Sequence, residues 1–148
     1  MSRMISFRGQ LDMGVIERIP LSTIRGLIGY KVKKFQLMSS RPGVMDVEYV
    51  GTIFKTNDPT NITIEPDFSD NRLVAAIYYQ DHNNIAYPAS TDVIFDLEKF
   101  NQDIFVSISD AAGGTVRCNY YIELEQMTLD LNEQTVATLK DIRNIGAE

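Results

Sequence analysis

Apolar and polar residues alternate along most of this 148-residue chain, and the alternation is most regular near its C-terminal end. From residue 116 to residue 125, even-numbered positions are apolar or aromatic and odd-numbered positions are polar or tyrosine. Successive side chains of a strand point to opposite faces of a sheet. The pattern therefore predicts a strand over about residues 115–128, with one buried face and one solvated face.

The same period of two predicts seven more strands. They cover residues 5–15, 27–38, 45–55, 62–66, 72–80, 91–97 and 103–109. Residues 72–80 are apolar on both parities, which predicts a strand covered on both faces. A connection is expected around Pro20, because proline removes a backbone donor. The glycine-containing loop "DAAGGT" predicts a hairpin between the last two strands.

Two positions interrupt the alternation. Gly9 lies inside the first strand pattern, which indicates a bulge or a close approach of another group to the backbone. Lys33 takes a place on the apolar parity of residues 27–38. This indicates a bulge or an exposed edge strand.

Eight short strands separated by turn signals predict an all-β fold, a single antiparallel β-sandwich. We expect the sandwich domain over residues 1–128 and a helical tail over residues 129–148. Eight strands in two packed sheets is the number found in a jelly roll. An immunoglobulin-like sandwich is the alternative, because strand order is not visible in the sequence.

The tail changes to a helical period. Asp130 and a glutamate three residues later resemble a capping box, which predicts a short C-terminal helix. Val136, Leu139 and Ile142 form one apolar stripe on it. A helix of this length is marginal unless it packs. The stripe is expected either to dock on the sandwich or to form an interface with a neighbouring subunit.

Charge and composition exclude several classes of function. The net charge is −6 and the pI is about 4.8, and the densest basic stretch holds only Lys31, Lys33 and Lys34. Nucleic-acid binding depends on lysine and arginine, so it is not expected. No apolar run reaches the ~20 residues that span a bilayer, and the N-terminus does not resemble a secretory signal. We expect a protein that binds no membrane and stays in a reducing compartment.

The carboxylates and the histidine predict no metal or cofactor. The loop residues Glu65, Asp67, Asp70 and Asn71 offer oxygen ligands for calcium, but the EF-hand spacing is absent, so a plain loop is favoured. His82 lies among Asp81, Asn83 and Asn84 in a turn. One histidine is too few for a typical zinc site.

The sequence also gives little support for a catalytic site. Cys118 is the only cysteine and lies on an apolar parity, which favours a small buried hydrophobe over a nucleophile. Glu123 and Glu125 lie on the same face of a strand, about 7 Å apart along it. Paired carboxylates at a suitable separation can catalyse glycoside hydrolysis. A solvated strand face explains them better, so no catalytic residue is expected.

Four tyrosines are candidates for surface recognition. They are Tyr78, Tyr79, Tyr87 and Tyr121. Exposed tyrosines serve as stacking platforms for carbohydrates and are enriched at protein interfaces. Tyr78 and Tyr79 are neighbours in a strand, so one of them must face the core.

The run "NYYIELEQMTLDLNEQTVATLKDIRN", preceded by "FNQDIFVS", resembles small uncharacterised proteins encoded by marine bacteriophages. The likeness covers roughly residues 100–144. It implies a non-enzymatic virion structural protein of jelly-roll form, either a capsid decoration (cement) protein or a minor capsid component.

Several expectations follow from this resemblance. The partners would be the major capsid protein or other virion proteins, and the chain would form a homo-oligomer. It would reside in the virion after assembly in the host cytoplasm. A carbohydrate-binding module, used in host adhesion, is the alternative function.

Overall fold

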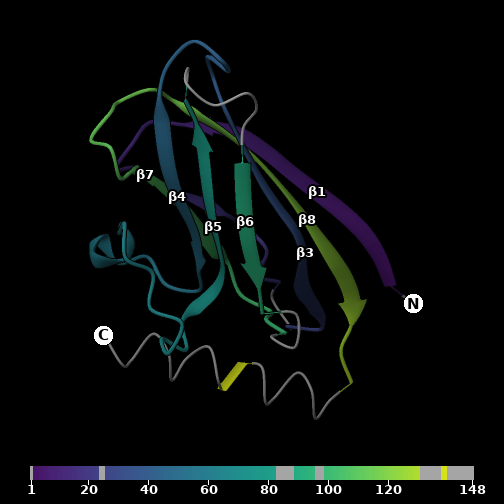
Figure 1. Cartoon of the computed structure of the whole chain (residues 1–148). Coiled ribbons are helices and arrows are strands. Elements are labelled where there is room, and N and C mark those ends of the chain that lie inside the picture. Colours follow the sequence, from purple (N-terminus) through teal and green to yellow (C-terminus); the bar gives the residue numbers. More distant parts are fainter. Residues whose placement is uncertain (1, 24–25, 83–88, 96–98, 131–137, 140–148) are drawn as a thin grey trace.

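The computed structural model describes residues 2–23, 26–82, 89–95, 99–130 and 138–139. Within these ranges it contains eight strands and one short 3-10 helix (Figure 1). The elements are β1 (Ser2–Leu11), β2 (Ile16–Ile19), β3 (Ile28–Ser39), β4 (Val47–Phe54), η1 (Pro59–Asn61), β5 (Leu73–Asp81), β6 (Ala89–Ile94), β7 (Ile104–Asp110) and β8 (Cys118–Thr128). The predicted all-β class is confirmed.

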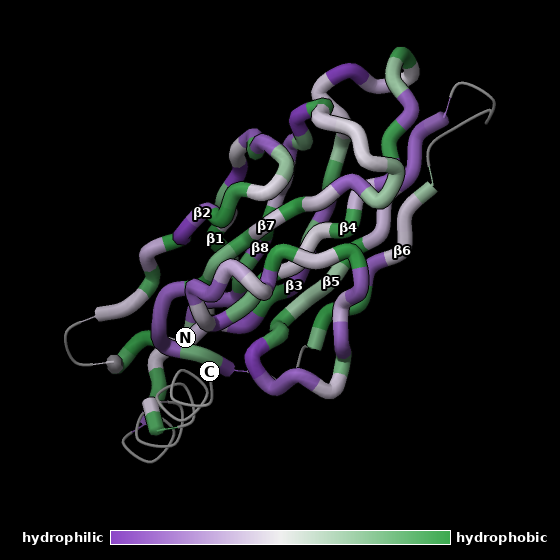
Figure 2. The backbone as a smooth tube through the Cα atoms, turned by 90° about the vertical axis from the view of Figure 1, so that its left-hand side faces the viewer, coloured by the Kyte–Doolittle hydropathy of each residue, from purple (hydrophilic) through white to green (hydrophobic). Residues whose placement is uncertain are grey.

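The strands form two antiparallel sheets that pack as a sandwich. One sheet has the order β1-β8-β3, and the other has the order β2-β7-β4-β5-β6 (Figure 1). The alternation of hydrophobic and hydrophilic residues along the strands can be followed in Figure 2. Phe35, Tyr49 and Phe100 are among the largest fully buried side chains of the core.

The strand order matches that of a jelly roll except at β6. A jelly roll is a long hairpin rolled up, so that strand 1 lies beside 8, 2 beside 7, 3 beside 6 and 4 beside 5. Here β1 pairs with β8, β2 with β7, and β4 with β5. The fourth pair is open: β6 contacts β3 but forms its hydrogen-bonded ladder with β5. An immunoglobulin-like order, which places strands 1 and 2 in one sheet, is excluded.

The predicted hairpin between the last two strands is wrong. β7 pairs with β2 and β4, whereas β8 pairs with β1 and β3, so the segment between them crosses from one sheet to the other. The Tyr49 hydroxyl lies 2.8 Å from the Val116 carbonyl oxygen and 3.0 Å from that of Arg117, and its one proton is donated to or shared between these two acceptors. This contact holds the crossing segment against β4.

The predicted connection around Pro20 contains a strand. The four residues of β2 pair with β7, and Ile19 lies in the core. Glu17 is on the same parity as Ile19 and accepts a hydrogen bond from the Tyr120 hydroxyl at 2.7 Å. Because the inward-facing Glu17 is charged, apolar and polar residues do not alternate along β2. The strand was therefore not predicted.

Two other predicted strands differ from the structure. The first ends at Leu11, because a turn at Gly14, with φ of +77°, precedes β2. The predicted strand at residues 62–66 is not a strand. It belongs to residues 55–72, which we call the cover segment because they lie over the outer face of the five-stranded sheet.

The cover segment explains why β5 is apolar on both parities. Beneath it, Thr52 and Ala76 are buried although they point away from the sandwich core. The Thr52 hydroxyl lies 3.1 Å from that of Ser107, and the buried side chain of Asn61 donates to the Thr56 carbonyl at 3.0 Å. The predicted double coverage is confirmed for residues 73–77, whereas Tyr78 is exposed.

Both predicted irregularities are confirmed. A Cβ atom added at Gly9 would lie 2.8 Å from the Tyr120 ring, so this glycine allows a close approach. The β3–β8 ladder shifts register between Val32 and Lys34, and β3 is an edge strand. Lys33 therefore marks a bulge on an exposed edge.

Most of the predicted C-terminal helix, including Val136 and Ile142, lies outside the described residues. Thr138 and Leu139 are helical, and the Leu139 side chain is 61% exposed. The Asn101 side-chain amide donates to the Thr138 hydroxyl at 2.8 Å, which ties this turn to the sandwich. Among the described residues, no helix is long and apolar enough to cross a membrane.

Candidate functional site

The paired carboxylates lie on the solvated face of the three-stranded sheet. Glu123 accepts a hydrogen bond from the Tyr121 hydroxyl at 2.8 Å and lies 3.6 Å from the Lys34 ammonium. Glu125 stands opposite Lys31 in the β3–β8 ladder. These are the cross-strand contacts of a polar sheet surface.

The loop carboxylates bind groups of their own loop. Asp67 accepts hydrogen bonds from the backbone and hydroxyl of Ser69, and these bonds lower its pKa. Asp70 binds the Arg72 guanidinium through both oxygens, at 3.0 and 2.8 Å, which lowers the pKa of that carboxyl. No group of three or more potential metal ligands gathers within the described ranges.

The lone histidine and its acidic neighbour have structural partners. His82 Nε2 lies 3.1 Å from Glu48 Oε1. Asp81 is buried and accepts a hydrogen bond from the Gly43 amide at 2.8 Å. The other residues of this candidate, Asn83 and Asn84, lie outside the described residues.

The cysteine is a buried hydrophobe, as its parity predicts. Cys118 is fully buried, and burial raises the pKa of its thiol to about 12. Since the thiolate is the nucleophilic form, this thiol is unreactive at neutral pH.

The tyrosines divide between core and surface. Tyr79 is buried and stacks on Tyr49 with ring centroids 6.0 Å apart, whereas Tyr78 is 39% exposed. The prediction that one of the two faces inward is confirmed. Tyr121 is half-buried on the outer face of β8, and Tyr87 lies outside the described residues.

Apolar side chains gather around Tyr78 on the outer face of the five-stranded sheet, beside the cover segment. We call this depression of about 250 Å³ the outer groove. Its lining residues are Val50, Ile64, Pro66, Phe68, Ala76, Ile77, Tyr78, Thr91 and Val93.

The rim of the outer groove is a set of exposed apolar side chains. Phe68 is 51% exposed, and Ile64 and Val93 are exposed beside it. Phe68 meets Phe95 edge to face, with ring centroids 5.4 Å apart, which fixes the orientation of its ring. Exposed apolar patches of this kind mark interaction surfaces.

The chemistry of the outer groove suits a protein side chain better than a sugar. Its polar side-chain groups are the hydroxyls of Tyr78 and Thr91, and the Tyr78 hydroxyl lies 3.2 Å from Gln80 Oε1. A glycan bound here would bury several of its own hydroxyls without partners, which is costly. An apolar side chain would bury no unpaired polar group by entering.

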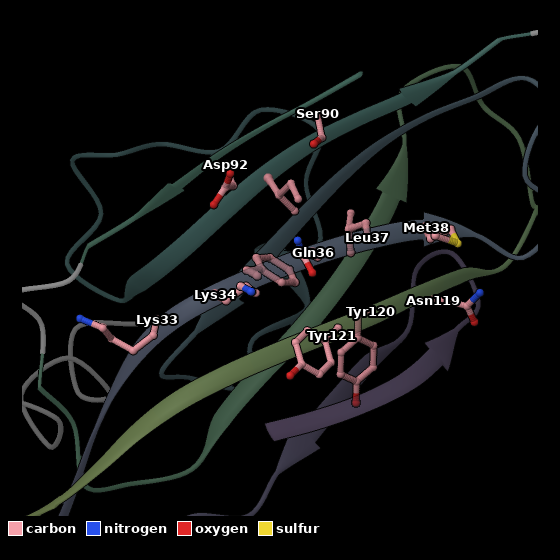
Figure 3. Close-up of a pocket in the computed structure, with 12 residues that line it drawn as sticks. Lys33, Lys34, Gln36, Leu37, Met38, Ser90, Asp92, Asn119, Tyr120 and Tyr121 are labelled. Carbon is pink, nitrogen blue, oxygen red and sulfur yellow. The ribbon is translucent and has the colours of Figure 1, made fainter. Parts of the chain in front are cut away.

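A second depression, the edge groove, lies along β3, with β6 on one side and Asn119, Tyr120 and Tyr121 of β8 on the other (Figure 3). It encloses about 480 Å³. Phe35 and Leu37 of β3 and Ile77 of β5 line its apolar part. Figure 3 shows Lys33 and Lys34 along β3, with Ser90 and Asp92 across the groove.

The sequence of β6 explains why the edge groove is open. Ser90 pairs with Tyr79 and Asp92 with Ile77, so these two residues share the inward side of the sheet with buried neighbours. Both are polar and exposed. The three-stranded sheet thus does not extend over β6, and solvent reaches the gap.

Neither groove was predicted from the sequence. Two residues that line the outer groove, Ile64 and Pro66, lie within residues 62–66, which were predicted to form a strand. For the edge groove, Lys33 gave a correct indication of the exposed edge. Comparison with known protein families and with curated proteins gives no match for this chain.

Proposed function

We propose that this chain is a non-enzymatic structural protein of a virus particle, a capsid decoration protein or minor capsid component. It binds the shell through the outer groove. The observation that carries the proposal is this exposed apolar surface, built from two sheet strands, an edge strand and the cover segment. A surface of this kind is expected where another protein docks.

Fold and charge support the proposal without determining it. Jelly rolls occur in viral capsid domains and also in lectins, and a fold hosts many functions. A net charge of −6 suits the outside of a shell better than the face that touches packaged nucleic acid. The likeness of residues 100–144 to small phage proteins points to the same role.

Purified particles of the virus that encodes this chain provide the test. Mass spectrometry should detect the chain in complete particles at a constant ratio to the major capsid protein. Added purified chain should pellet with particles that lack it. Absence of the chain from complete particles would contradict the proposal.

A matched pair of variants tests the outer groove itself. Phe68→Ser should abolish pelleting with particles, because it removes the most exposed aromatic side chain of the groove. Met4→Ser, on the outer face of the other sheet and also 51% exposed, should pellet as the unchanged chain does. If both variants lose pelleting equally, or if neither loses it, the outer groove is not the binding surface.

The C-terminal turn supports an oligomeric state. Leu139, on the predicted stripe with Val136 and Ile142, exposes most of its side chain although the adjacent Thr138 binds the sandwich. We propose that this stripe contacts a neighbouring subunit. Leu139→Asp should lower the sedimentation coefficient without changing the melting temperature of the monomer.

Carbohydrate binding is the second candidate. Phe68 and Tyr78 both expose aromatic rings at the outer groove, and sugars stack on rings of this kind. A glycan array, run with and without calcium, should show binding that Tyr78→Ala removes. An array without signal would exclude this function.

A further inference from the structure

From Val32 to Met38, the outer edge of β3 carries backbone groups that pair with no strand of the described residues. β3 pairs with β8 along one edge, and alternate residues of an antiparallel strand direct N–H and C=O to the other edge. On that side Tyr30 exchanges hydrogen bonds with Phe100, at 2.8 and 3.0 Å. From Val32 to Ser39, no strand of the described chain pairs with this edge.

The jelly-roll order shows what is missing there. Strand 6 is the neighbour that a closed roll places beside strand 3. Here β6 is bound to β5 instead, and the edge groove separates its exposed Ser90 and Asp92 from the apolar side chains of β3 (Figure 3). The sandwich therefore has an open position, with hydrogen-bonding groups along one wall and apolar groups at its base.

We infer that an extended segment of a partner polypeptide pairs antiparallel with the outer edge of β3 and occupies the edge groove. Addition of a strand to an exposed sheet edge is a recurring mode of peptide recognition, in which backbone bonds give affinity and alternate side chains give specificity. One parity of the segment lies against Phe35, Leu37 and Ile77. The other parity lies beside Gln36 and Met38.

Charge specifies the partner further. β3 carries Lys31, Lys33 and Lys34 in a chain with net charge −6. Lys34 lies 3.6 Å from Glu123 on the outer face, whereas Lys33 is exposed and has no ion-pair partner among the described residues. The partner segment is therefore expected to place an acidic residue beside Lys33, at its own C-terminal end.

The same lysines disfavour a second copy of this chain. The open edge of β3 begins at Val32, because Tyr30 already pairs with Phe100. Antiparallel pairing of two such edges over residues 32–39 would set Lys33 opposite Met38 and Lys34 opposite Leu37, so a second copy would bring no acidic residue of its β3 to these lysines. Lysines and bulges commonly protect edge strands against self-pairing, whereas an acidic strand remains acceptable.

A peptide titration tests the inference, and it holds whether or not the chain is a virion protein. The probe is a synthetic ten-residue peptide of alternating valine and threonine that ends in two glutamates. Backbone amide signals of the ¹⁵N-labelled chain should shift at residues 33–38 and 89–94. Replacing the two glutamates by lysines should weaken binding by about tenfold or more, because like charges then meet at Lys33.

Two controls separate strand pairing from simple charge attraction. Methylation of alternate backbone nitrogens of the peptide should abolish binding, since it removes the donors while leaving the charges. Lys33→Glu should reverse the preference between the two peptides. Arg8→Glu, which changes the net charge equally at an exposed site on β1, should leave it unchanged. Signal shifts elsewhere on the chain, or equal binding of the methylated peptide, would overturn the inference.

Discussion

The outer faces of the two sheets differ in what covers them. On the three-stranded sheet, polar side chains pair in contact with solvent: Gln10 binds Asn119 at 3.0 Å, and Glu123 contacts both Tyr121 and Lys34. On the five-stranded sheet, the corresponding positions are largely buried beneath the cover segment. One sheet meets water directly, whereas the other meets a second layer of its own chain.

This difference explains where the candidate binding surface lies. The cover segment closes over β4 and β5 near Thr52 and Ala76 but leaves the Tyr78 end open. The outer face of the five-stranded sheet stays apolar around Tyr78, where the cover segment no longer lies over it. The outer groove is thus the part of the covered face that the chain itself does not fill.

The cover segment is held mainly by polar contacts. Arg72, at the start of β5, binds Asp70 at 2.8 Å and lies 3.5 Å from Asp58, at the other end of the loop. Asp58 also caps η1 by accepting a hydrogen bond from the Thr60 amide. The comparison therefore predicts three levels of sensitivity: the shared core, the anchors of the cover, and the groove rim.

The largest effect is expected in the core that both sheets share. Phe35→Ala should lower the free energy of unfolding by about 3–5 kcal/mol, because it removes a fully buried ring and leaves a cavity. Urea denaturation measures the change. Met38→Ala, an exposed position three residues later on the same strand, should change stability by about 0.5 kcal/mol or less. Similar losses for both would mean that β3 is not packed as described.

An intermediate effect is expected at the anchors of the cover segment. Asp70→Asn should cost about 1–2 kcal/mol at pH 7, because it weakens charge-assisted hydrogen bonds to Arg72 at a partly exposed site. The folded pKa of Asp70 is lowered, so this stabilisation is present above about pH 4 and is lost as the pH falls through the folded value. The two proteins should therefore converge in stability as the pH falls below the folded pKa of Asp70.

The exposed pair on the opposite face is the control for this experiment. Asp12 and Arg117 lie 2.8 Å apart, but both side chains are 61% exposed. Asp12→Asn should change the unfolding free energy by less than about 0.5 kcal/mol at pH 7. An effect as large as that of Asp70→Asn would remove the distinction between the covered face and the solvated one.

The smallest effect on stability is expected at the groove rim. Phe68→Ser should cost about 1 kcal/mol or less, since the ring is half exposed and its one aromatic contact among the described residues is with Phe95. Thermal denaturation measures this. A loss above about 3 kcal/mol would show that Phe68 holds the cover segment in place rather than serving a partner.

The sequence predicts strand positions well because burial alternates with a period of two along each strand. Gly9 and Lys33 were interpreted correctly for the same reason, since each breaks that period in a way that has a local cause. The eight-strand sandwich follows from these local patterns. β2 escaped prediction because Glu17 is satisfied by Tyr120, a residue 103 positions away.

Sheet membership and the grooves depend on contacts that no local pattern encodes. The loop "DAAGGT" permits a hairpin or a crossing, and the choice is made by pairing of β7 with β4 and of β8 with β1. Ile62 and Ile64 alternate with polar residues as a strand would, but they belong to a layer packed on a sheet. The outer groove is lined by four segments distributed over residues 50–93, so composition alone did not reveal it.

The most direct test of the proposed docking surface is oxidative footprinting of the chain on intact virus particles and free in solution. Phe68 and Tyr78 should be oxidised several-fold more slowly on the particle, because the outer groove is then covered. Met4 and Tyr121, on the outer face of the three-stranded sheet, should react at the same rate in both states. Protection of Met4 and Tyr121 with unchanged oxidation of Phe68 and Tyr78 would contradict the account.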